Sequence, residues 1–169
     1  GGERCGCQDE PPGMALTGNM IMKSYDHAPI SQKWRISYTA AREFASNLKE
    51  KYNIQAPSLS TQVNKLSGGN LQKVILAREI SCGPTLIVAV QPTRGLDVGA
   101  IEGIQNLLLE QREKDAAVLL ISEELDELLD LSDRIAVIFE GELAGIFPTE
   151  EADVKTIGLL MTGELRRQE

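Results

Sequence analysis

The sequence LSGGNLQK, at residues 66–73, lies directly before a strongly periodic helical pattern. Ser67 is a preferred helix N-cap residue, and Gly68 and Gly69 allow a bulky anion to approach the first helical turn. The first N–H groups of a helix have no partner within the helix, and the helix dipole adds a partial positive charge there. The stretch therefore predicts a helix N-terminus suited to a phosphate. An ordinary serine cap followed by glycines would give the same pattern.

Length and composition describe an acidic protein of one domain, or of one domain with a small appendage. The 169 residues are 42% hydrophobic and only 4% aromatic, so aliphatic side chains must form most of the core. A net charge of −8 argues against a nucleic-acid surface, where Lys and Arg neutralise phosphates. We therefore expect no nucleic-acid partner. We also recognise no signal peptide, and no apolar run approaches the ~18–20 residues of a membrane-spanning helix.

The cysteines and the single histidine give no sign of a metal or catalytic centre. Cys5 and Cys7 offer two ligands, but no nearby Cys or His pair completes a tetrahedral set. We expect free thiols in a reducing cytoplasm and no metal site. His27 lies in a polar, loop-like stretch without an obvious catalytic partner.

The first half of the chain is predicted to be mostly helical. Residues 19–25 form a candidate short helix. Thr39 is predicted to cap a clearer helix whose apolar residues share one face: Ala41, Phe44, Ala45, Leu48 and Tyr52. The helix that follows Ser67 is expected to end at Gly83-Pro84.

The second half alternates between strands and helices. Residues 85–90 and 116–121 are short apolar runs, typical of strands buried on both faces, with an amphipathic helix between them. This strand–helix–strand order predicts a parallel pair with a right-handed crossover.

The last third of the chain is predicted to hold an acidic helix, a hairpin and a terminal helix. A strand at 134–139 turns at Glu140-Gly141 into a second strand at 142–146. A helical pattern surrounds Ile157 in the tail. The leucines of the acidic helix are predicted to point inward: Leu125, Leu128 and Leu129.

A helical region followed by three motifs resembles the ATP-binding cassette of ABC transporters. The motifs are LSGGNLQKVILAREI from residue 66, LIVAVQPTRGLD from residue 86 and VLLISEELDEL from residue 118. The resemblance covers nearly the whole chain. It is greatest to the second cassette of the tandem ATPases that energise uptake of simple sugars and nucleosides. GMALTGNM, LSDRIAVIFEGEL and IGLLMTGE also resemble that branch.

The resemblance implies an α/β fold, namely part of a P-loop NTPase (RecA-like) with a mostly parallel sheet and an α-helical subdomain. The strand that carries the Walker A loop is not expected in this chain. The implied segments are a loop at 1–13, the helical subdomain at 14–83, the C-terminal part of the RecA-like subdomain at 84–147 and a tail at 148–169.

The resemblance also implies roles for individual residues. Ser67, Gly68, Gly69 and Asn70 match the signature motif, which closes over the γ-phosphate held by the opposite cassette. Gly95-Leu96-Asp97 matches the D-loop, which crosses the interface between two cassettes. The helical subdomain would lean on the membrane permease.

Three positions depart from the family pattern, and a Walker A sequence GxxxxGK[ST] does not occur in the chain. Val90 and Gln91 replace the Asp-Glu that ends the Walker B motif, so an Mg²⁺ ligand and a general base are missing. Glu123 occupies the switch histidine position, where a carboxylate would repel a γ-phosphate.

Each departure has an alternative interpretation. A misalignment would explain Val90 and Gln91, but Pro92-Thr93 and the D-loop fix the register. Glu123 and Glu124 also fit an acidic first turn that complements a helix dipole.

The resulting prediction is a degenerate cassette of an ABC importer for simple sugars or nucleosides. It supplies the LSGGN signature to the ATP site of a partner cassette, which binds ATP and Mg²⁺. The expected partners are that cassette in the same tandem polypeptide, permease subunits and, indirectly, a substrate-binding protein. The expected location is the cytoplasmic face of the membrane, and no catalytic residue is assigned. The chain alone is not expected to hydrolyse ATP.

An alternative is a cassette-derived regulatory or assembly module without a link to transport. In either case, a sheet without the Walker A strand is expected to leave parallel edges unpaired, and the chain is expected either to self-associate or to keep apolar sheet surface exposed.

Overall fold

The computed structural model describes residues 13–32 and 35–165. It divides into two compact units, Gly1–Leu119 and Leu120–Glu169, each of which is described by itself. Cys5 and Cys7 lie outside the described residues, as does almost all of the expected loop at 1–13. The expected boundaries after residues 83 and 147 remain predictions.

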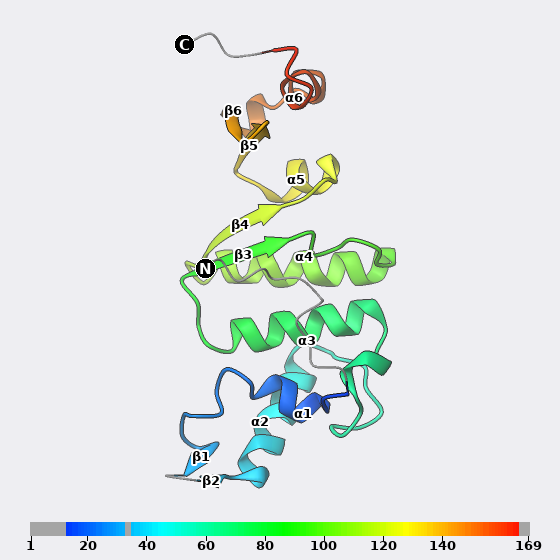
Figure 1. The fold of residues 1–169 in the computed structure, drawn as a ribbon, viewed down its shortest axis with the longest axis vertical. Coiled ribbons are helices and arrows are strands. Elements are labelled where there is room, and N and C mark those ends of the chain that lie inside the picture. The colour runs from blue at the N-terminus through cyan, green and yellow to red at the C-terminus, as the bar shows by residue number, and fades with distance from the viewer. Residues whose placement is uncertain (1–12, 33–34, 166–169) are drawn as a thin grey trace. The chain divides into compact units, whose positions relative to one another are not determined.

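The N-terminal part of the first unit is mostly helical, as predicted (Figure 1). It contains α1 (Leu16–Met20), the antiparallel pair β1 (Ser31–Gln32) and β2 (Arg35–Ile36), α2 (Tyr38–Lys51) and the 3-10 helix η1 (Val63–Lys65). The core between α1 and α2 holds Leu16, Met20, Ala41, Ala45 and Leu48.

Two local predictions in this part are wrong. The first helix spans Leu16–Met20 rather than residues 19–25, because contacts with a distant loop set its start: the Leu16 N–H donates to the Thr61 carbonyl at 2.9 Å. Ser37, rather than Thr39, caps α2, and its hydroxyl accepts from the Ala40 N–H at 3.4 Å.

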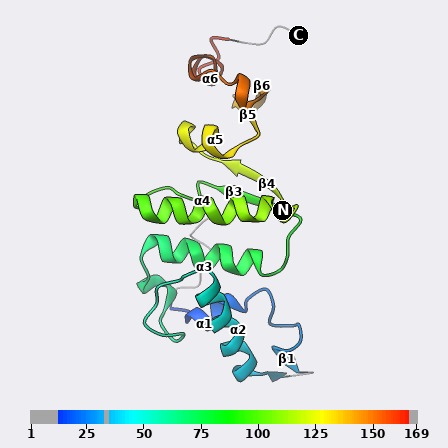
Figure 2. The same cartoon turned by 180° about the vertical axis from the view of Figure 1, so that it is seen from behind.

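The remainder of the first unit has a layered α/β arrangement. Its elements are α3 (Gly68–Ile80), β3 (Leu86–Val90), α4 (Val98–Arg112) and β4 (Ala117–Ile121), whose first residues belong to this unit. β3 and β4 are hydrogen-bonded neighbours, and their arrows point the same way, which confirms the predicted parallel pair (Figure 1). Figure 2 shows α4 alongside the strands, with α3 on the other side of α4.

The prediction that both strands are buried on both faces is wrong: no residue of β4 is buried, and β3 is buried on one face only. Its residues alternate: Ile87 and Ala89 are buried, whereas Leu86, Val88 and Val90 remain 57%, 42% and 41% exposed. α4 lies along the buried face, and the other face stays open in the described residues of this unit.

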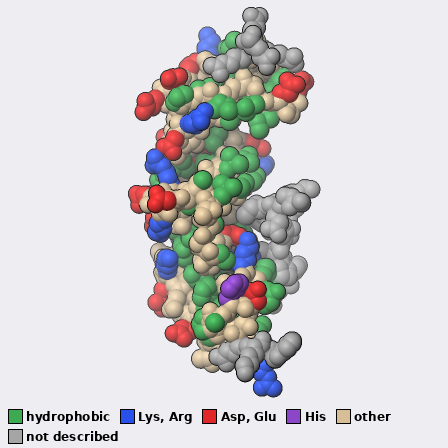
Figure 3. Space-filling model, turned by 90° about the vertical axis from the view of Figure 1, so that its left-hand side faces the viewer, with side chains coloured by type: hydrophobic (Ala, Val, Ile, Leu, Met, Phe, Trp, Pro, Cys, Tyr) green, Lys and Arg blue, Asp and Glu red, His purple; other side chains and the backbone are tan. Residues whose placement is uncertain are grey.

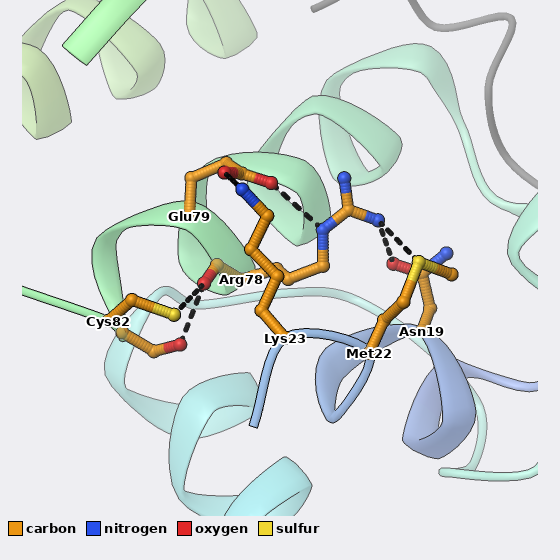
Figure 4. A network of polar contacts seen from close by, with 7 residues as sticks. Asn19, Met22, Lys23, Arg78, Glu79 and Cys82 are labelled. Atoms are coloured by element: carbon orange, nitrogen blue, oxygen red, sulfur yellow. Dashed lines mark hydrogen bonds and ion pairs between the residues drawn. The ribbon is translucent and has the colours of Figure 1, made fainter. Parts of the chain in front are cut away.

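A polar network joins α1 and the turn after it to the C-terminal end of α3 (Figure 4). The Arg78 guanidinium donates to the Asn19 side-chain oxygen at 3.1 Å and pairs with Glu79, also at 3.1 Å. Lys23 pairs with the other oxygen of Glu79. Asn19 is fully buried, so Arg78 satisfies an acceptor that water does not reach.

The second unit is built on the predicted hairpin. β5 (Arg134–Phe139) pairs antiparallel with β6 (Glu142–Pro148), and Glu140 and Gly141 turn the chain with φ angles of +49° and +84°. Positive φ at both positions is the geometry of a two-residue hairpin loop, which favours glycine. α5 (Leu125–Leu131), the 3-10 helix η2 (Thr149–Glu151) and α6 (Val154–Met161) complete the unit.

The core of the second unit forms between the hairpin and the helices. Ile135, Val137, Ile157 and Leu160 are buried together, and the predicted inward leucines of α5 pack against them. Asp153 caps α6 by accepting from Thr156, and these hydrogen bonds hold the pKa of the Asp153 carboxyl below its usual value.

The described surface carries both signs of charge. On the face shown in Figure 3, basic and acidic side chains are interspersed. Among residues 13–32 and 35–165, no helix combines the length and the apolar character that a membrane span requires. The same residues contain no cluster of His, Cys, Asp and Glu able to hold a metal ion.

Candidate functional site

Ser67 ends the loop before α3 and is its N-cap, as predicted. Its hydroxyl oxygen accepts from the backbone N–H of Asn70 at 3.5 Å and from the side-chain amide of Asn70 at 2.9 Å. Ser67 and Gly68 are exposed, whereas Gly69 is buried. The first turn of α3 therefore presents a hydroxyl and a helix N-terminus to solvent.

Asn70 links this turn to the loop after α2. Its side-chain oxygen accepts from the backbone N–H of Gln55 at 2.7 Å. The side chain of Gln55 in turn donates to Asn53 at 2.6 Å. The role of Gln55 is not evident from the sequence, because it contacts Asn70 through its backbone N–H, a group that every residue except proline has.

The signature and the D-loop are brought into direct contact. A Cβ atom on Gly69 would lie 2.5 Å from Cβ of Ala100, and one on Gly68 would lie 3.1 Å from Cδ2 of Leu96. At Gly69 only a glycine permits this approach of α3 to the start of α4. Two motifs separated in sequence thus form one surface of the first unit. Ala100 is a site residue that the motif pattern did not single out.

The D-loop leads directly into α4. Asp97 caps that helix, and its side chain accepts from the Ala100 N–H at 2.9 Å. The Leu96 N–H donates to the Thr93 carbonyl at 3.2 Å. Gly95 lies in this turn with a φ of +73°.

Val90 and Gln91 lie where β3 ends and the loop that leads to the D-loop begins. Val90 is the last residue of the strand, and its side chain is partly exposed. Gln91 has a φ of +50°, and its carbonyl accepts from the Arg94 N–H at 3.3 Å. Neither side chain is a carboxylate, so neither supplies an anionic ligand or a strong base at the end of this strand.

Glu123 belongs to the second unit, where it is exposed. It precedes α5, whose N-cap is Glu124 and whose first-turn acids are Asp126 and Glu127. The backbone N–H of Glu124 donates to the Ser122 hydroxyl at 3.1 Å. The acids that complement the dipole of α5 from within its first turn are therefore Asp126 and Glu127 rather than Glu123.

Comparison with known proteins identifies extensive similarity to import ATP-binding proteins. The chain is 43% identical over 150 residues to the guanosine import ATP-binding protein NupO of Bacillus subtilis, covering 89% of the chain and 29% of that protein. It is 45% identical over 152 residues to the glucose import ATP-binding protein TsgD13 of Haloferax volcanii, covering 89% of the chain and 28% of the relative. No family model matches the chain.

This chain is homologous to the ATP-binding proteins of ABC importers. The cassette segment spans about 29% of the length of NupO.

Solved structures show the same fold. The dimeric ATP-binding cassette MJ0796 bound to ADP and phosphate matches with a TM-score of 0.66 at 23% identity, covering 83% of this chain and 59% of that one. A putative metal-chelate type ABC transporter in an inward-facing conformation matches with a TM-score of 0.74 at 15% identity, covering 91% and 60%. The predicted fold class, an α/β P-loop NTPase fold of which this chain forms a part, is confirmed.

Proposed function

We propose that this cassette segment supplies its signature to an ATP site on a partner cassette of an ABC importer. The observation that carries the proposal is the N-terminus of α3: an exposed serine hydroxyl, followed by glycines that pack against the D-loop. A γ-phosphate needs hydrogen-bond donors, and the Ser67 hydroxyl and the N–H groups at this turn are donors. ATP fits this turn through its terminal phosphate.

The end of β3 supports a role in trans rather than hydrolysis by this segment. The side chain of Val90 has no oxygen for Mg²⁺, and the amide of Gln91 can hydrogen-bond a water but cannot take its proton. We assign Mg²⁺ and the chemical step to the partner cassette, in the same tandem polypeptide. Glu123 adds a negative charge, and a carboxylate at the switch position opposes a γ-phosphate.

The assembly follows from the same proposal. Residues 14–83 form the helical subdomain that leans on permease subunits, and a substrate-binding protein delivers the cargo to them. The segment works at the cytoplasmic face of the membrane. NupO is a guanosine import protein and TsgD13 a glucose import protein, so the proposed cargo class is a nucleoside or a simple sugar. The dimeric MJ0796 cassette, bound to ADP and phosphate, supports a paired arrangement.

The test is Ser67→Arg in the intact protein that contains this chain, assembled with its permease. Arginine removes the hydroxyl and fills the space in front of the helix N-terminus. We expect transport-coupled ATP hydrolysis to fall by about 100-fold or more, the order of loss seen when one donor to a developing charge is removed. The measurement is phosphate release, with and without cargo.

The matched control is Asn64→Arg. Asn64 is exposed in η1 and lies close to Ser67 in the sequence, so it receives the same added charge outside the turn. Hydrolysis close to the wild-type rate is expected for Asn64→Arg. Full activity of the Ser67→Arg protein would overturn the proposed function.

A further inference from the structure

The hydroxyl of Ser67 has one proton to donate and two lone pairs with which to accept. Asn70 directs both of its N–H groups at this oxygen, from the backbone at 3.5 Å and from the side chain at 2.9 Å. With its lone pairs engaged by one neighbour, the hydroxyl has only its proton left for a ligand. The serine is thereby held as a donor.

The orientation of the Asn70 amide is fixed from its other end. The backbone N–H of Gln55 can only donate, and it contacts the Asn70 side-chain oxygen at 2.7 Å. The amide nitrogen must therefore face Ser67. Asn70 is half-buried in this position, whereas Ser67 is exposed.

We propose that Asn70 is a positioning residue, which holds the Ser67 hydroxyl as a proton donor toward the γ-phosphate of ATP and is itself held by the Gln55 backbone. This inference rests on the proposed function of the signature. Asn70 acts through Ser67 rather than by contact with the nucleotide. A phosphate oxygen at neutral pH accepts hydrogen bonds and does not donate them. A serine hydroxyl that rotates freely would point its proton at the phosphate for only part of the time, and would therefore be a weaker donor.

A purely structural role for Asn70 predicts a different result from a positioning role. A helix cap that merely stabilises α3 would matter whether or not Ser67 is present. A residue that orients the Ser67 hydroxyl has nothing left to orient once that hydroxyl is removed. A double-mutant cycle separates these two roles.

The experiment measures kcat for ATP hydrolysis in the intact, assembled protein for Ser67→Ala, Asn70→Ala and the double variant. We expect Ser67→Ala to lower kcat by about 100-fold and Asn70→Ala by at least about 10-fold. The double variant should be no slower than Ser67→Ala alone. Asn64→Ala is the control, because Asn64 is exposed in η1, outside this hydrogen-bond network, and the change should leave kcat unchanged.

Asn70→Asp provides a second variant should Asn70→Ala fail to fold, as judged by its melting curve. It keeps the acceptor for Gln55 but turns the donor toward Ser67 into an acceptor, so the serine proton is drawn away from the nucleotide. A loss of kcat of at least about 10-fold is expected, since the donor to the developing charge is misdirected.

The outcomes distinguish the inference from the function on which it rests. Wild-type kcat in Ser67→Ala would overturn both. A slow Ser67→Ala protein beside unaltered Asn70 variants would overturn the inference alone. So would losses that multiply in the double variant, because Asn70 would then act independently of Ser67.

Discussion

The glycines at the start of α3 differ in what surrounds them. A side chain on Gly68 would meet the end of Leu96, a flexible group able to rotate away. A side chain on Gly69 would overlap Ala100, whose Cβ would lie only 2.5 Å away. Since alanine has no further bond to rotate, the backbones of α3 and α4 would have to separate. Gly69 therefore sets how closely the signature approaches the D-loop.

Gly69→Ala is expected to destabilise the protein by about 1–3 kcal/mol through overpacking between the helices. The matched control is Gly99→Ala, next to Ala100, where an added Cβ meets only the Asp97 carboxylate at an ordinary 3.6 Å. In the first turn of a helix this change should be neutral or should stabilise by about 0.5–1 kcal/mol. Urea unfolding of both variants measures the difference. Equal midpoints for Gly69→Ala and the wild type would show that the helices do not need this close contact.

Elements whose boundaries are set by local chemistry were predictable from the sequence. The Ser67 cap, the strand at 134–139 and the Glu140-Gly141 turn are confirmed because each signal lies within a few residues. The start of α1 was not predictable, since it depends on the carbonyl of Thr61, far along the chain. Two further contacts arise only from tertiary packing: the approach of Gly69 to Ala100 and the hydrogen bond from the Gln55 N–H to Asn70.

The contact between α1 and α3 combines a buried and an exposed interaction. Arg78 is only 14% exposed and donates to the fully buried Asn19, whereas the Lys23 side chain is 44% exposed in its pair with Glu79 (Figure 4). Loss of a partner from a buried polar group costs more than loss of a surface ion pair, because water does not replace the missing bond.

Arg78→Ala is accordingly expected to cost about 2–3 kcal/mol of stability, the range for a charge-assisted hydrogen bond whose partner is left unsatisfied. Lys23→Ala removes the exposed member of the same network and should cost no more than about 1 kcal/mol. Thermal unfolding of the two variants gives the comparison. If Lys23→Ala destabilised the protein as much as Arg78→Ala, the buried Arg78–Asn19 hydrogen bond would not contribute more than the exposed Lys23–Glu79 pair, and the prediction would be wrong.

One face of the β3–β4 pair is apolar and remains exposed in the described residues. Ala117 donates from its N–H to the Thr85 carbonyl at 2.9 Å, which places Leu119 on the same face as Leu86 and Val88. These residues are 52%, 57% and 42% exposed. The expectation of exposed apolar sheet surface is thus confirmed for the described residues. The solved cassettes that match this chain extend beyond it, since it covers 59% of MJ0796.

The isolated 169-residue chain is therefore expected to bind a dye that fluoresces on apolar surfaces, and to self-associate in sizing experiments at raised concentration. Val88→Thr together with Leu119→Thr should reduce both signals, because threonine keeps strand propensity while removing apolar area. Val98→Thr is the control: Val98 is 81% exposed but is the first residue of α4 rather than part of a strand. If the unaltered chain runs as a monomer and binds no dye, the exposed apolar face of the β3–β4 pair does not drive self-association, and the prediction is wrong. If Val98→Thr lowers both signals as much as the strand variants do, general surface hydrophobicity rather than the sheet face causes them.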